Sequence, residues 1–98
     1  SNTISGVTAL RNDFGRYINI TGGTEPGAHS AGSDHYKGSA LDFGQSANQN
    51  YAALTSYIQN KDRSPATNSR GELVYTFQLN GQQIKATKES DHWHITFN

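Results

Sequence analysis

The segment LVYTFQLNGQQI, residues 73–84, carries the clearest signal of local structure in this chain of 98 residues. Apolar side chains occupy every second position of its first half: Leu73, Tyr75, Phe77 and Leu79. This alternation predicts a strand with one buried face. Asn80-Gly81 then supplies the two positive-φ residues of a type I′ turn, and Ile84 falls in the returning strand. The segment therefore predicts an antiparallel hairpin.

A second alternating segment lies near the end of the sequence. Trp93, Ile95 and Phe97 alternate there with His92, His94 and Thr96. Because side chains two residues apart share a face of a strand, we expect one apolar face and one face that carries both imidazoles. Two shorter segments, Ser39–Phe43 and Ile18–Thr21, also read as strands.

Two segments show the three- and four-residue spacing of amphipathic helices. The first runs from Thr3 to Tyr17, with Asn2 or Thr3 as its cap. Its apolar stripe consists of Ile4, Val7, Leu10, Phe14 and Tyr17. The second runs from about Ala47 to Lys61, and its apolar face consists of Tyr51, Leu54, Tyr57 and Ile58.

The remaining segments read as loops. A stretch rich in Gly, Ser and Pro extends to Asp34, and a polar stretch runs from Asp62 to Gly71. The order of helices and strands predicts a single domain over residues 1–98 with an α+β fold, in which two helices pack against a small, largely antiparallel sheet.

Composition excludes several classes of function. Eight Lys and Arg balance eight Asp and Glu, so the chain lacks the positive charge expected of a protein that binds nucleic acid or anionic membranes. No apolar run approaches the length of about 18 residues needed to span a membrane. The sequence contains no Cys, so any metal site must be built from His and carboxylate ligands.

All four histidines fall in two short stretches that also contain acidic residues. His29 and His35 lie in the first stretch, and His92 and His94 in the second. A catalytic zinc ion needs three N or O ligands and an open position for water, and His35, Asp42 and His94 could supply that set. Asp42 stands in an otherwise apolar strand, where an uncompensated buried carboxylate costs several kcal/mol. We therefore expect a metal to compensate its charge.

Other interpretations of these residues stay open. A single His or carboxylate at a strand end is more often a structural group than a ligand, and His92 with His94 could form a solvent-facing pair on an amphipathic strand. His29 lies in a Gly- and Ser-rich loop and reads as a neighbour of the site or as a solvated side chain. A Ser-His-Asp arrangement lacks the spacing of a nucleophile elbow.

Two segments resemble a known family. His35-Tyr36-Lys37-Gly38-Ser39-Ala40-Leu41-Asp42-Phe43 resembles the His, small-residue, Asp motif of the zinc DD-peptidase superfamily, peptidase family M15. Glu89-Ser90-Asp91-His92-Trp93-His94-Ile95 resembles its second motif, an acidic residue followed closely by the last zinc-binding His. Ala28-His29-Ser30 resembles the hedgehog version of the loop. The resemblance implies a hedgehog-like or DD-peptidase-like fold.

The resemblance also implies roles for individual residues. His35, Asp42 and His94 become the ligands of Zn²⁺, and Asp91 becomes the general base at a position where the family more commonly has Glu. Glu89 is the rival for that role, and His92 becomes a hydrogen-bond donor to the oxyanion. His29 and Tyr36, together with Glu89, are the candidates for contacts around the metal or with substrate. The arginine with which the family binds a substrate carboxylate has no match here.

The function implied is that of a zinc metallopeptidase, either a carboxypeptidase or an endopeptidase, that cleaves peptidoglycan stem peptides or cross-links. The expected partner is a peptidoglycan peptide, with no nucleic acid and no membrane span, and the expected state is a monomer. The resemblance places such a protein in the periplasm, in the cell wall or on a phage. The alternative is a catalytically weak or inactive metal-binding recognition module with the same fold. A purely structural domain is the third reading and requires that no metal binds.

Overall fold

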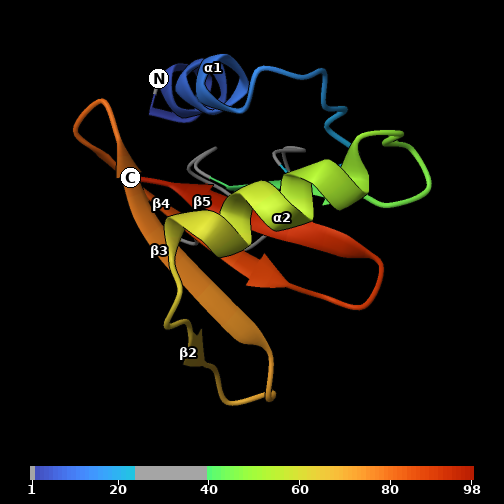
Figure 1. Ribbon diagram of the computed structural model, residues 1–98, viewed down its shortest axis with the longest axis vertical. Helices are drawn as coiled ribbons and strands as arrows, with labels where there is room; N and C mark the ends of the chain where they lie inside the picture. Colours follow the sequence, from blue (N-terminus) through green and yellow to red (C-terminus); the bar gives the residue numbers. More distant parts are fainter. Residues whose placement is uncertain (1, 24–39) are drawn as a thin grey trace.

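The computed structural model describes residues 2–23 and 40–98. Its elements, in chain order, are α1 (Asn2–Phe14), β1 (Ala40–Gly44), α2 (Tyr51–Lys61), β2 (Ala66–Thr67), β3 (Leu73–Leu79), β4 (Gln82–Lys88) and β5 (His92–Phe97). Figure 1 shows α2 lying across the sheet, with α1 above it. The two helices and the five-stranded antiparallel sheet confirm the predicted α+β class.

The sheet has the strand order β1-β5-β4-β3-β2, and every neighbouring pair is antiparallel. The predicted hairpin is confirmed as β3 and β4, and its turn residues Asn80 and Gly81 have φ values of 51° and 79°. A second hairpin joins β4 to β5. The strand β1 then pairs with β5, which lies about half the chain away in sequence.

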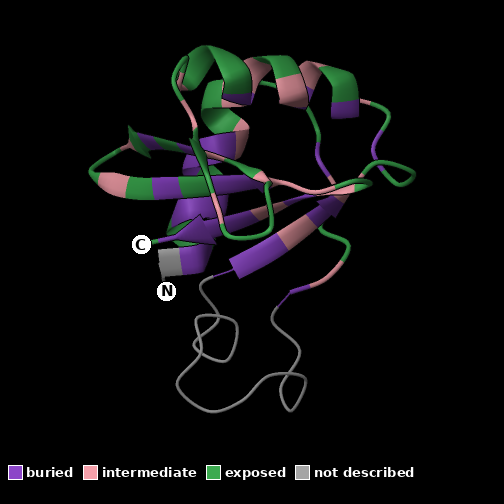
Figure 2. Cartoon of the chain, turned by 90° about the horizontal axis from the view of Figure 1, so that it is seen from below, coloured by how far each residue is buried: buried purple, intermediate pink, exposed green. Residues whose placement is uncertain are grey.

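One face of this sheet forms the core with both helices. The predicted apolar side chains of β5, which are Trp93, Ile95 and Phe97, are fully buried. Leu10 of α1 and Leu54 of α2 belong to the same apolar cluster. Most residues of β1 and β5 are buried, whereas the outer side of α2 is exposed (Figure 2). The opposite face of the sheet therefore remains for polar side chains.

The first helix is shorter than predicted. It ends at Phe14 because Gly15 adopts a φ of 79° and its N–H donates to the Arg11 carbonyl at 2.8 Å. Tyr17 therefore lies outside the helix, and both Tyr17 and Ile4 are exposed rather than part of the apolar stripe. The helix already includes Asn2 and Thr3, so the cap prediction was wrong.

The second helix begins at Tyr51 rather than near Ala47, because the chain between β1 and α2 forms turns that the Asn48 side chain holds. Leu73 was predicted to be buried but is exposed, since it lies at the outer end of β3. The segment Ile18–Thr21 is extended but forms no strand in the described part of the chain. The polar stretch from Asp62 to Gly71 contains the two-residue strand β2. Ser39 and the loop that ends near Asp34 fall outside the described residues.

Within the described ranges, no helix is long and apolar enough to cross a membrane.

The first prediction concerns the contact between α1 and β5. A Cβ atom at Gly6 would overlap the ring of Phe97, which is fully buried and cannot move away. We expect Gly6→Ala to destabilise the fold by about 1–3 kcal/mol through overpacking, although Ala is the better helix former. Ser5→Ala, at the exposed neighbouring position, is the control and should change stability by less than about 0.5 kcal/mol. Thermal unfolding measures both, and a raised melting temperature for Gly6→Ala would contradict the packing described here.

The second prediction concerns the contact between the helices. Asp13 of α1 pairs with Lys61 at 2.8 Å and accepts a hydrogen bond from Tyr57 at 2.7 Å, and these two contacts lower the pKa of Asp13. A lowered folded-state pKa gives stability that is present above the unfolded pKa of about 3.9 and is lost as the pH falls through the folded value. The pair is partly exposed, so we expect Asp13→Asn to cost less than about 1 kcal/mol at about pH 7.

Thermal unfolding over a series of pH values measures this effect. The difference between the wild type and Asp13→Asn should shrink as the pH falls below about 4. Lys61→Gln breaks the same ion pair from the other side. It should therefore lower the free energy of unfolding by a similar amount at about pH 7. A difference that stays constant down to acidic pH would exclude this contribution.

Candidate functional site

Asp42 and His94 face each other on the polar side of the sheet. They are directly paired residues of β1 and β5, and His94 Nδ1 lies 2.8 Å from Asp42 Oδ1. Their side chains are 28% and 23% exposed. Because side chains alternate along a strand, Asp42 points away from the core that receives Leu41 and Phe43. The expectation that Asp42 is a buried carboxylate was therefore wrong, and His94 is a polar partner of this half-buried side chain.

The backbone of Asp42 is fixed from the outer edge of β1. Its N–H donates to the Gly22 carbonyl at 2.9 Å, and its own carbonyl accepts from the Thr21 N–H at 2.8 Å. The Thr21 hydroxyl accepts from the Gly44 N–H at 2.9 Å. The isolated bridge between Gly22 and Asp42 therefore lies just after the segment Ile18–Thr21 that was predicted as a strand. It holds the carboxylate in place.

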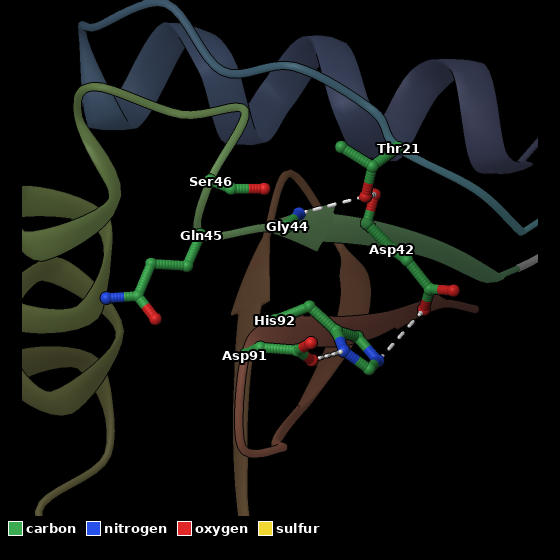
Figure 3. A pocket seen from close by; sticks show the side chains of 7 residues that line it. All are labelled: Thr21, Asp42, Gly44, Gln45, Ser46, Asp91 and His92. Carbon is green, nitrogen blue, oxygen red and sulfur yellow. Dashed lines mark hydrogen bonds and ion pairs between the residues drawn. The ribbon is translucent and has the colours of Figure 1, made fainter.

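His92 lies on the same face of β5 as His94, as the two-residue spacing predicted. Its Nε2 is 3.9 Å from Asp42 Oδ1 and 3.4 Å from Glu89 Oε1, while its Nδ1 is 2.8 Å from Asp91 Oδ1. Burial lowers the pKa of His92, but the three carboxylates outweigh it and raise this pKa above its usual value. The imidazole is therefore held between carboxylates from β1 and from the turn before β5 (Figure 3).

Asp91 lies in the bend before β5, where the sequence spacing required it to be. Its side chain is 81% exposed, and its hydrogen bond with His92 lowers its pKa. Its backbone carbonyl accepts from the Gln45 N–H at 2.8 Å, which ties this bend to the end of β1. Glu89 is less exposed, at 26%, and its N–H donates to the His92 carbonyl.

A cavity of about 520 Å³ lies beside these residues. It is lined by Thr21, Asp42, Gly44, Gln45, Ser46, Asp91 and His92 (Figure 3). Three of the predicted site residues, Asp42, Asp91 and His92, therefore share one cavity. Sequence reasoning missed Thr21, Gln45 and Ser46, because no motif marks them and only the fold brings them beside β5.

The predicted residues His35, His29 and Tyr36 lie outside the described residues. Within residues 2–23 and 40–98, no three His, Cys, Asp or Glu side chains are grouped to hold a metal ion. Asp42 and His94 nevertheless provide a carboxylate oxygen and an imidazole nitrogen, which are both common zinc ligands. Two ligands of a tetrahedral zinc ion lie about 3.3 Å apart, so the 2.8 Å between these atoms needs only a small opening. The pair therefore fits two positions of a zinc site.

Comparison with known proteins adds no assignment, since no family model, curated protein or solved structure matches this chain.

Proposed function

We propose that the chain is a zinc-dependent peptidase domain that cleaves peptidoglycan stem peptides or cross-links, with a fold related to the hedgehog and DD-peptidase proteins. The pairing of Asp42 with His94 carries the proposal, because it joins the two motifs that resemble this family across 52 residues of sequence. Asp91 and His92 at the adjoining cavity support it further. The proposed protein is a monomer that acts outside the cytoplasm, in the periplasm or cell wall, or on a phage.

Asp42 and His94, with His35, are the residues that would hold the metal. A zinc ion bound there would lower the pKa of a water molecule toward about 7 and polarise a peptide carbonyl. Neutral imidazole and ionised carboxylate are the forms that bind zinc.

Asp91 is the proposed proton acceptor. Its lowered pKa keeps it ionised at neutral pH, and unlike Glu89 it lines the cavity. From there its carboxylate can take a proton from a nucleophilic water and return it to the leaving amine. The hydrogen bond with His92 fixes the orientation of this carboxylate.

His92 is the proposed hydrogen-bond donor to the substrate carbonyl oxygen. Asp91 lies 2.8 Å from its Nδ1, whereas the contact of Nε2 with Glu89 is longer, at 3.4 Å, so Nε2 is the nitrogen proposed to donate to substrate. The protonated imidazole, in which both nitrogens donate, is the form that this role requires. A donor placed where negative charge develops acts mainly in the transition state.

A metal-binding recognition module is the second candidate. One observation favours it: Asp91 and Glu89 both contact the His92 imidazole. In addition, the Asp91 side chain is one methylene shorter than the Glu that the family more commonly has at this position. If neither carboxylate can reach a water molecule at the metal, the domain would bind a peptide without cleaving it.

The third prediction concerns zinc binding. We expect the protein to bind one Zn²⁺, and Asp42→Ala and His94→Ala each to weaken that binding at least about 100-fold, because each removes a ligand. His92→Ala, on the same face of the same strand, is the matched control and should keep the metal. Calorimetric titration and metal analysis measure this, and full zinc binding by His94→Ala would refute the ligand assignment.

Bound zinc should also stabilise the fold. Zinc at about 1,000 times its dissociation constant would stabilise the folded state by about 4 kcal/mol, and each kcal/mol raises the melting temperature of a domain of this size by about 4–8 °C. An unchanged melting curve after verified removal of zinc by a chelator would show that metal and fold are not linked.

The fourth prediction separates the two carboxylates. At matched zinc occupancy, Asp91→Asn should lower turnover of peptidoglycan fragments by about 10²–10⁴-fold, and Asp91→Glu should retain activity. Glu89→Gln is the matched comparison and should lower turnover much less, because Glu89 contacts His92 but does not line the cavity. Mass spectrometry of the released fragments measures the reaction.

Two results would change these assignments. Loss of turnover in Glu89→Gln with wild-type activity in Asp91→Asn would exchange the two roles. If the zinc-loaded wild type cleaves no stem peptide or cross-link, the peptidase proposal fails and the recognition module replaces it.

A further inference from the structure

A second cavity, of about 510 Å³, lies next to the candidate site. It is lined by Tyr17, Asn19, Gln45, Ser46, Asn48 and Gln49, together with Ala47. Gln45 and Ser46 line both cavities, so a ligand in one lies beside the other. Figure 3 shows these two residues on the segment that leaves β1, with Gly44 between them and Asp42.

Side-chain hydrogen bonds hold the walls of this second cavity in place. The Asn48 side chain is buried, and its Oδ1 accepts from the Asn19 N–H at 2.6 Å. Its Nδ2 donates to the carbonyls of Asn19 and Gly44 at 3.1 and 2.7 Å. Asn19 Nδ2 donates in turn to the Ala47 carbonyl at 2.8 Å. The segment before β1 and the segment after it are thus fixed to each other.

The exposed side chains of this cavity are free to bind a ligand. Gln45, Ser46 and Gln49 are exposed, and their side chains make no hydrogen bond within the described part of the chain. Tyr17 is 65% exposed, and its ring is held by a hydrogen bond from its hydroxyl to Asn19 Oδ1. The cavity therefore offers amide and hydroxyl groups beside one fixed aromatic ring.

The chemistry of the lining defines the ligand. Among the described residues, its lining contains no Arg or Lys for a phosphate or carboxylate and no Asp or Glu for a cation. These described lining residues also include no large aliphatic side chains, which recognition of an apolar peptide side chain requires. Amide and hydroxyl groups can bind ligand hydroxyl and acetamido groups, and an aromatic ring can stack against the apolar face of a pyranose ring. A neutral sugar matches all of these groups.

We infer that this cavity binds a neutral sugar, which the proposed function narrows to an N-acetylated one. The sugar site stands on its own contacts, whereas its identification with the glycan strand of peptidoglycan rests on the proposed function. A glycan in the second cavity would place an attached stem peptide at Asp42 and His92, because Gln45 and Ser46 are shared by the two cavities.

The test is a titration of the full chain with the tetrasaccharide of N-acetylglucosamine, followed by two-dimensional NMR with and without a zinc chelator. We expect shifts at Tyr17, Gln45 and Gln49 that saturate and do not depend on zinc. Tyr17→Ala and Gln49→Ala should each weaken binding about tenfold, as loss of one good contact does, and Tyr17→Phe should weaken it less because the ring is kept. Gln59→Ala, at an exposed position of α2, is the matched control for Gln49→Ala and should leave binding unchanged.

Three results would overturn the inference: no binding of the tetrasaccharide, equal loss of binding in Gln59→Ala, or saturable shifts at these residues from a free stem peptide instead of the sugar. The outcomes also separate this inference from the proposed function. Sugar binding without cleavage of any stem peptide removes the peptidase proposal alone, and cleavage without sugar binding removes the sugar site alone.

Discussion

The pairing of β1 with β5 is the contact on which the rest of this structure depends. It joins residues 40–44 to residues 92–97 and adds β1 to a sheet whose other strands follow one another closely in sequence. On one face of the pair, Phe43 lies opposite Trp93, and both side chains are fully buried. On the other face, Asp42 lies opposite His94. The contact that completes the core therefore also assembles the candidate site.

This arrangement follows from the two-residue period of a strand. Leu41 and Phe43 enter the core, so Asp42 must point to the opposite side, and the same alternation directs Trp93 and Ile95 inward and His94 outward. A one-residue slip in register would exchange the faces and place the polar residues in the core. The large cost of burying Asp42 and His94 thus fixes the register that brings them together.

The turn that carries Glu89 and Asp91 is anchored to the core by Lys88. Its Nζ donates to the Glu89 carbonyl at 3.0 Å and lies over the rings of Tyr51 and Trp93, at 5.7 and 5.8 Å from their centroids. Both rings are buried, so the lysine links the turn to α2 as well as to β5. The backbone of this turn is consequently held from two sides, by this lysine and by the bond from the Gln45 N–H to the Asp91 carbonyl.

The sequence by itself determined the local elements and the faces of the strands. Asn80-Gly81 specified a turn, and alternation placed His92 and His94 on one side of β5, because these features depend only on neighbouring residues. The ends of the helices were less predictable, since Gly15 and the contacts of Asn48 decided them. Only the tertiary structure decided that Asp42 faces away from the core and that Thr21, Gln45 and Ser46 line its cavity. Those relations depend on strand pairing between distant segments, which no local pattern encodes.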